Sequence, residues 1–173
     1  MRPETLAIHA GHEPDHATGS IVPPIYQTST YVQDAIGQDR GFVYSRTGNP
    51  SRSLLEKSLA AVEEAKYALC FASGMSAINN ILLLLESGSH VVCPASVYGG
   101  TFRILEFVYK RFGIEADFVD VADLGAVERA IRPNTRMLWL ESPTNPLLGL
   151  CDIEALATLA HAKGLTTVVD NTF

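Results

Sequence analysis

From residue 50 onward, short apolar runs alternate with longer amphipathic stretches. The apolar runs have the length of buried strands, and they are residues 67–73, 90–94, 115–120, 135–142 and 166–170. Apolar residues recur with helical spacing in residues 50–65, 74–87, 101–113, 124–131 and 152–164. Continuous apolar strands that alternate with helices are typical of a mostly parallel sheet covered by helices on both faces. We therefore predict an α/β fold of this kind.

Local signals mark where several of these helices begin and end. Asn49 is a candidate N-cap, and Pro50 stands at the first helical position after it. Gly88 follows one of the amphipathic stretches, and Gly113 and Gly164 end two others. Glycine is the residue that most often ends a helix, so these positions are expected helix ends.

Residues 1–50 differ from the rest of the chain. They are rich in Gly, Pro, Thr and Tyr and show little periodicity, and Pro23 and Pro24 preclude a helix around them. A segment of this length without its own helices would be an unusual loop inside a compact domain. We expect it to be an extended arm that lies over another surface, such as a partner subunit.

Composition excludes several classes of protein. The 173 residues are 47% hydrophobic and 18% charged, which is a globular composition with enough length for one domain. The net charge of −6 and the scattered basic residues argue against nucleic-acid binding. The longest apolar run, residues 78–85, is too short to span a membrane, and the N-terminus has no signal-peptide core. Three cysteines without CxxC spacing are expected to be reduced thiols in a cytoplasmic protein.

Candidate chemistry gathers where the predicted strands end. Ligands of parallel sheets bind outside the carboxyl ends of the strands. The segments that follow predicted strands and carry suitable groups are residues 73–75, 95–100, 141–145 and 170–172. All four should therefore lie at one edge of the sheet.

The groups at this edge allow both functional and plain structural interpretations. The turn Ser73–Met75 runs into a helix and suits a phosphate, or it is a tight turn with nothing bound. Tyr98, before two glycines, stacks on a flat ligand ring or is simply half-buried. Asn145 contacts a ligand oxygen or makes a turn before a proline.

Three further groups have open interpretations. Asp170 ends an apolar strand and needs a partner, which is a protonated pyridine nitrogen, a metal ion or the start of a following helix. Arg46, near Tyr44, is a phosphate clamp or a solvated side chain. The histidines at positions 9 and 12 have no downstream partners in a zinc pattern, so no metal site is expected.

Six motifs in order carry a resemblance to a known family. They are "IVPPIYQTSTY", "YSRTGNPSRSLLEKSLAA", "FASGMSAI", "VYGGTFR", "ESPTNP" and "VVDNTF". Together they resemble the Cys/Met metabolism, or trans-sulfuration, family of pyridoxal 5′-phosphate (PLP) enzymes. The resemblance implies an aspartate-aminotransferase-like fold of type I, with an N-terminal arm (residues 1–50) and a large PLP-binding domain that starts at residue 51. It also implies a cytoplasmic homotetramer in which the arm reaches the neighbouring active site.

The resemblance also implies roles for individual residues. Tyr98 would stack on the cofactor ring and assist proton transfer, and Asp170 would pair with the ring nitrogen. The cofactor-binding positions would be Tyr44, Arg46, Ser73, Gly74, Met75, Tyr98, Asp170 and Thr172. The positions that line the substrate site would be Asn145, Arg103 and Glu141.

One expected residue of the family is missing from the chain. The Schiff-base lysine of these enzymes lies downstream of the strand that ends in Asp170, and the lysines present, which match no cofactor position, are Lys57, Lys66, Lys110 and Lys163. We therefore interpret residues 51–173 as an incomplete, truncated PLP domain that is inactive by itself. The full-length enzyme is expected to catalyse γ-elimination or γ-replacement on a sulfur amino acid, as cystathionine γ-lyases and γ-synthases do. The alternatives are a methionine γ-lyase, an O-acyl-homoserine sulfhydrylase, or a short non-catalytic α/β binding protein.

Overall fold

The computed structural model describes residues 2–173, which form two compact units. The first unit ends at Ala72, and the second spans Ser73–Phe173. Within the described residues, no helix is both long enough and apolar enough to cross a membrane.

The first unit contains two helices, α1 (Pro3–His9) and α2 (Pro50–Val62), joined by a long irregular segment. The predicted cap of α2 is confirmed, because the side-chain oxygen of Asn49 accepts the Ser51 N–H at 2.9 Å and the Arg52 N–H at 3.2 Å. The arm was expected to have no helix, and α1 shows that this was wrong. Pro3 starts that helix, and it is supported by contacts with helix α2, which is distant in the sequence.

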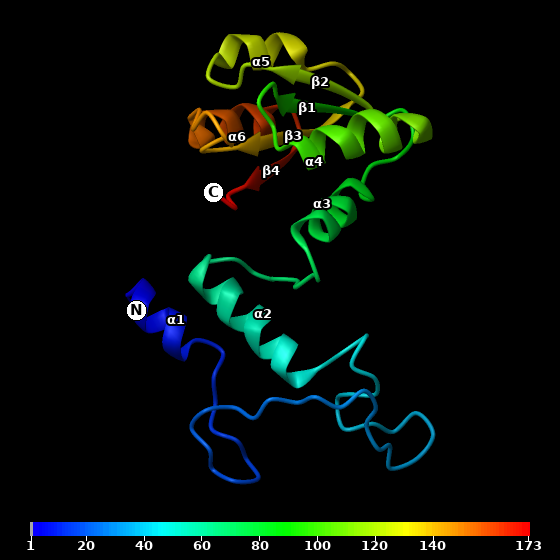
Figure 1. Ribbon diagram of the computed structural model, residues 1–173, viewed down its shortest axis with the longest axis vertical. Coiled ribbons are helices and arrows are strands. Elements are labelled where there is room, and N and C mark those ends of the chain that lie inside the picture. The colour runs from blue at the N-terminus through cyan, green and yellow to red at the C-terminus, as the bar shows by residue number, and fades with distance from the viewer. Residues whose placement is uncertain (1) are drawn as a thin grey trace. The chain divides into compact units, whose positions relative to one another are not determined.

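The second unit is built on a four-stranded parallel sheet in the order β2-β1-β3-β4 (Figure 1). Its strands are β1 (His90–Pro94), β2 (Glu115–Val119), β3 (Thr135–Glu141) and β4 (Thr166–Asp170). The helices of this unit are α3 (Gly74–Leu82), α4 (Gly99–Arg103), α5 (Leu124–Ala130) and α6 (Ile153–Ala162). This arrangement confirms the predicted α/β fold with its parallel sheet.

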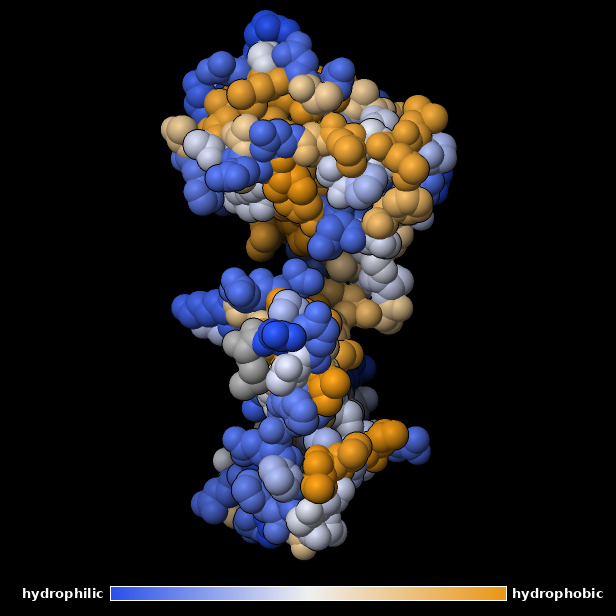
Figure 2. All heavy atoms as spheres, turned by 90° about the vertical axis from the view of Figure 1, so that its left-hand side faces the viewer, coloured by the Kyte–Doolittle hydropathy of each residue, from blue (hydrophilic) through white to orange (hydrophobic). Residues whose placement is uncertain are grey.

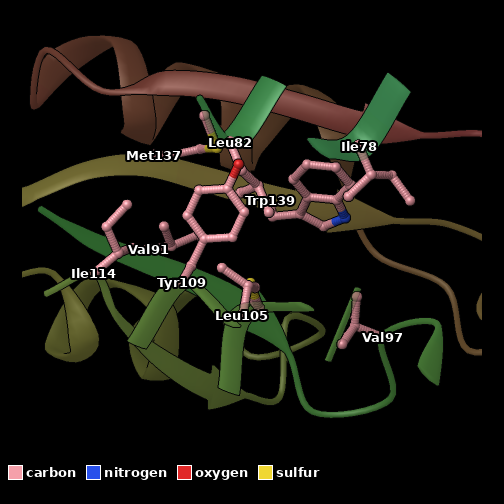
Figure 3. Close-up of a cluster of buried hydrophobic side chains, with 10 residues drawn as sticks. Ile78, Leu82, Val91, Val97, Leu105, Tyr109, Ile114, Met137 and Trp139 are labelled. Carbon is pink, nitrogen blue, oxygen red and sulfur yellow. The ribbon is translucent and has the colours of Figure 1, made fainter. Parts of the chain in front are cut away.

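Alternate residues of the central strands form two apolar cores, one on each face of the sheet. On one face, Val91, Met137 and Trp139 pack with Ile78 and Leu82 of α3 (Figure 3). On the other face, the core residues are Val92, Val127, Leu138, Leu140, Leu156 and Ala160, which include side chains of α5 and α6. Because strand residues alternate between faces, the central strands β1 and β3 each contribute to both cores and are buried on both sides.

One predicted strand is absent. Residues 67–73 are extended but pair with no strand among the described residues, so the expectation of a fifth strand was wrong. Tyr67 and Leu69 are each 75% exposed, although their alternation with less exposed residues is that of a strand. A strand needs a neighbour for its backbone groups, and an apolar pattern alone does not supply one.

Two helices differ in detail from the prediction. Helix α3 ends at Leu82 and not at Ser87, because Leu83 and Leu84 are exposed and only part of the leucine run faces the core. Residues 99–112 do form a helical stretch that ends at Gly113, which has a φ of 79°. The stretch is irregular, however, with a π-helical turn at Ile104–Val108 and a 3₁₀ turn at Tyr109–Phe112.

Apolar side chains also lie on the surface of both units (Figure 2). In the first unit, Ile21, Val22 and Ile25 are exposed by 84%, 76% and 81%. All three residues belong to one short sequence segment, residues 21–25.

Candidate functional site

A pocket of about 570 Å³ lies at the carboxyl edge of the sheet. All four segments that were predicted to meet at this edge contribute to its lining. The predicted residues that line it are Ser73, Gly74, Met75, Tyr98, Glu141, Asn145, Asp170 and Thr172. The rest of the wall is mainly apolar and includes Ile78, Ile81, Trp139 and Val168.

The N-terminus of helix α3 presents backbone N–H groups at one side of this pocket. The Ser73 hydroxyl accepts the N–H of Ser76 at 3.1 Å and so caps the helix. Gly74 and Met75, in the first turn, have N–H groups without a partner inside the helix. The space beside the Gly74 Cα is open, since a Cβ there would meet no atom within 4 Å. This corner suits a small anion such as a phosphate group.

Tyr98 lies at the start of α4, lines the pocket and is 42% exposed, so its side chain is partly accessible. Its position depends on the absence of a side chain at Gly100. A Cβ at Gly100 would collide with the Tyr98 ring and would lie 2.6 Å from the sulfur of Met75. Gly100 therefore makes room for both pocket residues.

Glu141 ends β3, and its carboxylate joins two loops of the pocket. Its Oε2 accepts the backbone N–H of Tyr98 at 2.7 Å, and its Oε1 accepts the backbone N–H of Asn145 at 3.2 Å. The residue is only 5% exposed. Two backbone donors thus satisfy a nearly buried acid.

Asp170 ends β4 directly beside Glu141, its register partner on β3. Its Oδ1 accepts both the backbone N–H of Thr172, at 3.1 Å, and the Thr172 hydroxyl, at 2.6 Å. Its other oxygen, Oδ2, makes no hydrogen bond to any residue in the described part of the chain. A half-buried carboxylate oxygen of this kind can accept a hydrogen bond from a cationic ring nitrogen.

Trp139 is a pocket residue that the sequence interpretation missed. Its side chain is 1% exposed, its indole nitrogen has no partner among residues 2–173, and its ring lies close to Ile78 in the core (Figure 3). The signal was present in the strand period, because Trp139 lies two residues before Glu141 and so shares its face of the sheet. Val168 lies on the same face as Asp170 for the same reason.

Three of the predicted site residues lie outside the pocket lining. Arg103, at the end of α4, is exposed and does not line it. Tyr44 and Arg46 belong to the first unit, where the Arg46 guanidinium carbon lies 4.8 Å from the centre of the Tyr44 ring. Arg52 supports this loop by donating to the carbonyls of Ser45 and Thr47, each at 3.0 Å.

No lysine is among the residues that line the pocket. Lys110 pairs with Glu106, and Lys163 pairs with Glu128 at 3.5 Å. In residues 2–173, no three His, Cys, Asp or Glu side chains are close enough together to hold a metal ion. The three cysteines of the described chain form no disulfide, and burial raises the pKa of the Cys93 thiol.

Comparison with known proteins places this geometry in a family. The family model for Cys/Met metabolism PLP-dependent enzymes matches residues 4–173. The chain belongs to this family. A probable cystathionine gamma-synthase of Herpetosiphon aurantiacus is 53% identical over 169 residues, which are 98% of this chain and 53% of that protein. A cystathionine gamma-lyase of Bacillus subtilis is 46% identical over 173 residues, which are 100% of this chain and 46% of that protein.

Solved structures of the Cys/Met metabolism family show the same fold. The crystal structure of metB from Corynebacterium glutamicum has a TM-score of 0.96 and 43% identity, and covers 100% of this chain and 46% of that one. The structure of cystathionine gamma-lyase from Lactobacillus plantarum complexed with L-serine has a TM-score of 0.94 and 47% identity. The match covers 100% of this chain and 45% of that one. The chain thus spans about half the length of the relatives it matches.

The pocket residues fit the PLP cofactor of the family. A free helix N-terminus suits its phosphate, an accessible Tyr98 ring suits its pyridine ring, and an acid with one unused oxygen suits its ring nitrogen. Trp139 also lines the pocket, and its buried indole N–H has no partner among residues 2–173. What the pocket lining lacks is the lysine that holds the cofactor covalently in the family.

Proposed function

We propose that this chain is the amino-terminal part of a PLP-dependent enzyme that catalyses γ-elimination or γ-replacement on a sulfur amino acid. The observation that carries the proposal is the convergence of the α3 N-terminus, Tyr98 and Asp170 on one pocket. The relatives named cystathionine gamma-synthase and cystathionine gamma-lyase support this reaction class. A methionine γ-lyase or an O-acyl-homoserine sulfhydrylase would use the same groups and is the alternative within the family.

The chain's own residues would hold and orient the cofactor. The N–H groups of Gly74 and Met75 would bind its phosphate, with Ser73 fixing the start of the helix. Tyr98 would cover the ring and exchange a proton with the substrate amine through its hydroxyl oxygen. Asp170 would keep the ring nitrogen protonated, with Thr172 orienting the carboxylate by two hydrogen bonds. PLP, when bound, supplies an electron sink for carbanion chemistry.

The substrate would lie on the open side of the cofactor. Asn145 lines the pocket, and its amide would contact the ring hydroxyl of the cofactor or the carboxylate of the amino acid. Arg103 is exposed at the end of α4, and we retain it as a candidate for substrate binding from its position in the family motif.

We also propose that the protein is cytoplasmic and forms a homo-oligomer, namely the tetramer that the family resemblance implies. Tyr44 and Arg46 would bind the phosphate in a neighbouring subunit, with residues 1–50 as the arm and residues 51–173 as part of the PLP domain. The strong exposure of Ile21, Val22 and Ile25 supports a partner for the arm, because exposed apolar side chains are unfavourable in water.

The covalent lysine would come from residues that follow position 173 in a longer protein. The test is to express the longest reading frame that contains this chain, beside the 173-residue chain itself. We expect only the longer protein to cleave cystathionine or to form it from an O-acyl-homoserine and cysteine. A reading frame that stops at Phe173, together with no PLP binding, would favour a non-catalytic binding protein.

A further inference from the structure

We propose that Glu141 is a positioning residue that fixes Tyr98 and Asn145 relative to Asp170. The inference rests on the proposed function, since that function assigns Tyr98 and Asp170 to the cofactor and Asn145 to the cofactor or substrate. In this role Glu141 acts through the backbone of Tyr98 and Asn145, whose N–H groups it accepts.

The hydrogen bonds of Glu141 carry this inference. Each carboxylate oxygen accepts one backbone N–H, from Tyr98 at 2.7 Å and from Asn145 at 3.2 Å. These donors lie 43 and 4 residues away in sequence, on the loop after β1 and the loop after β3. One side chain therefore joins two separate loops of the same pocket.

The chemistry of the site requires a carboxylate here. A carboxylate has two acceptor oxygens, whereas a glutamine side chain has one acceptor and one donor. In a Glu141→Gln variant, the –NH2 group would face a backbone N–H, and one of the two loops would lose its bond. Within residues 2–173, Glu141 makes no ion pair, so these two N–H groups are the partners of a nearly buried charge.

Strand register extends the arrangement to Asp170. Glu141 and Asp170 are paired positions on β3 and β4, so the backbone of the sheet sets the distance between them. Tyr98 is tied to Glu141 by the shorter of the two hydrogen bonds. The same pair of strands, β3 and β4, therefore positions both Tyr98, which would cover the cofactor ring, and Asp170, which would meet the ring nitrogen.

The test compares Glu141→Gln with Glu86→Gln in the 173-residue chain. Glu86 is exposed and lies before the amino end of β1, so the control makes the same chemical change away from the pocket. Two quantities are measured: backbone amide hydrogen exchange, and binding of PLP followed by the circular dichroism that the cofactor acquires when bound.

For Glu141→Gln, we expect roughly tenfold faster exchange at whichever of the Tyr98 and Asn145 amides faces the new –NH2 group and so loses its acceptor. The core amides of Val92 and Leu138 should exchange at the wild-type rate. PLP should bind roughly tenfold more weakly and with a smaller dichroism signal. Glu86→Gln should match the wild type in every measurement.

Three outcomes would overturn the inference. They are unchanged exchange at both loop amides, faster exchange with unchanged PLP binding, and equally faster exchange in the core strands, which would indicate general destabilisation. Failure of the proposed function is distinguishable, because the longer protein would then neither cleave nor form cystathionine, while the exchange at Tyr98 and Asn145 in the 173-residue chain still reports on the hydrogen bonds of Glu141.

Discussion

Glu141 and Asp170 occupy paired positions at the ends of the adjacent parallel strands β3 and β4. Their carboxylates have different partners: Glu141 accepts two backbone N–H groups from two loops, while Asp170 uses one oxygen for Thr172 and leaves the other without a partner among residues 2–173. Two neighbouring acids are thus divided into one that orders the pocket and one that can bind a cationic group.

Asp170→Asn should separate stability from ligand binding. Removing one of two acids at neighbouring strand ends relieves any repulsion between them, so thermal stability should be unchanged or slightly higher. Binding of PLP should weaken by at least roughly tenfold, because a neutral amide cannot hold a protonated ring nitrogen. Thermal unfolding and a PLP titration of both proteins measure the two effects. Unweakened binding would contradict the role of Asp170.

Gly100→Ala should displace the Tyr98 ring without unfolding the protein. The new methyl group would collide with that ring and with the Met75 sulfur, and both are side-chain atoms that can move. Alanine is more favourable than glycine in a helix by about 1 kcal/mol, which offsets the crowding in α4. We expect little change in melting temperature and weaker PLP binding. A large loss of stability would show that the pocket is too rigid for this account.

Arg52→Lys should loosen the loop that carries Tyr44 and Arg46. A lysine ammonium cannot reproduce the forked bonds of Arg52 to the Ser45 and Thr47 carbonyls. Trypsin should therefore cleave after Arg46 several-fold faster in the variant, because cleavage requires the loop to open. Mass spectrometry of the early fragments measures the rate.

The matched control for this change is Arg129→Lys. Arg129 makes an exposed ion pair with Asp123 at 3.4 Å, and such pairs contribute little to stability. Its cleavage rate after Arg46 should equal that of the wild type. Equal rates in all three proteins would remove Arg52 as the support of the loop.

Stability should decrease as the pH falls below about 7, because of His90. His90 is fully buried, its Nδ1 lies 2.8 Å from the Thr135 hydroxyl, and its Nε2 lies 3.4 Å from Asp117. Burial, followed by the charge of Arg132, lowers the pKa of His90 from 6.5, although Asp117 and Glu115 raise it. At pH values between the pKa of His90 in the folded chain and its higher pKa in the unfolded chain, the unfolded chain binds a proton that the folded chain does not. The free energy of unfolding therefore decreases as the pH is lowered through that interval.

His90→Gln should reduce this pH dependence. Its contribution to the slope is at most about 1.4 kcal/mol per pH unit, the limit for a single proton. Urea unfolding at several pH values between 5 and 8 measures the slope, and the exposed His161→Gln is the control. If both variants keep the wild-type slope, His90 is not the group responsible.

The sequence predicted the positions of individual strands better than the number of strands in the sheet. Strands such as residues 90–94 and 166–170 were identified at their observed bounds, because continuous apolar runs and clear breaks define them. Residues 67–73 have an equally apolar pattern but lie outside the sheet, since pairing depends on a neighbour that no local pattern reveals. Helix α1 was missed for the related reason that α2, distant in sequence, supports it.

In the pocket, the sequence indicated the residues but not their contacts. Tyr98 and Asp170 could be predicted because polar or aromatic residues after buried strands meet at one edge. The contacts of Glu141 could not, because they depend on how two loops fold back onto one carboxylate. Trp139 was missed because an apolar residue inside a strand is expected to belong to the core. Trp139 does belong to the core, and it also lines the pocket.

The central claim is that the pocket at the carboxyl edge binds PLP, and the fluorescence of Trp139 tests it most directly. Trp139 is the one tryptophan of the chain and lines the pocket, so bound PLP should quench its emission by energy transfer. We predict saturable quenching that inorganic phosphate competes away and that Asp170→Asn weakens. Quenching that does not saturate, or that is identical in the variant, would contradict the claim.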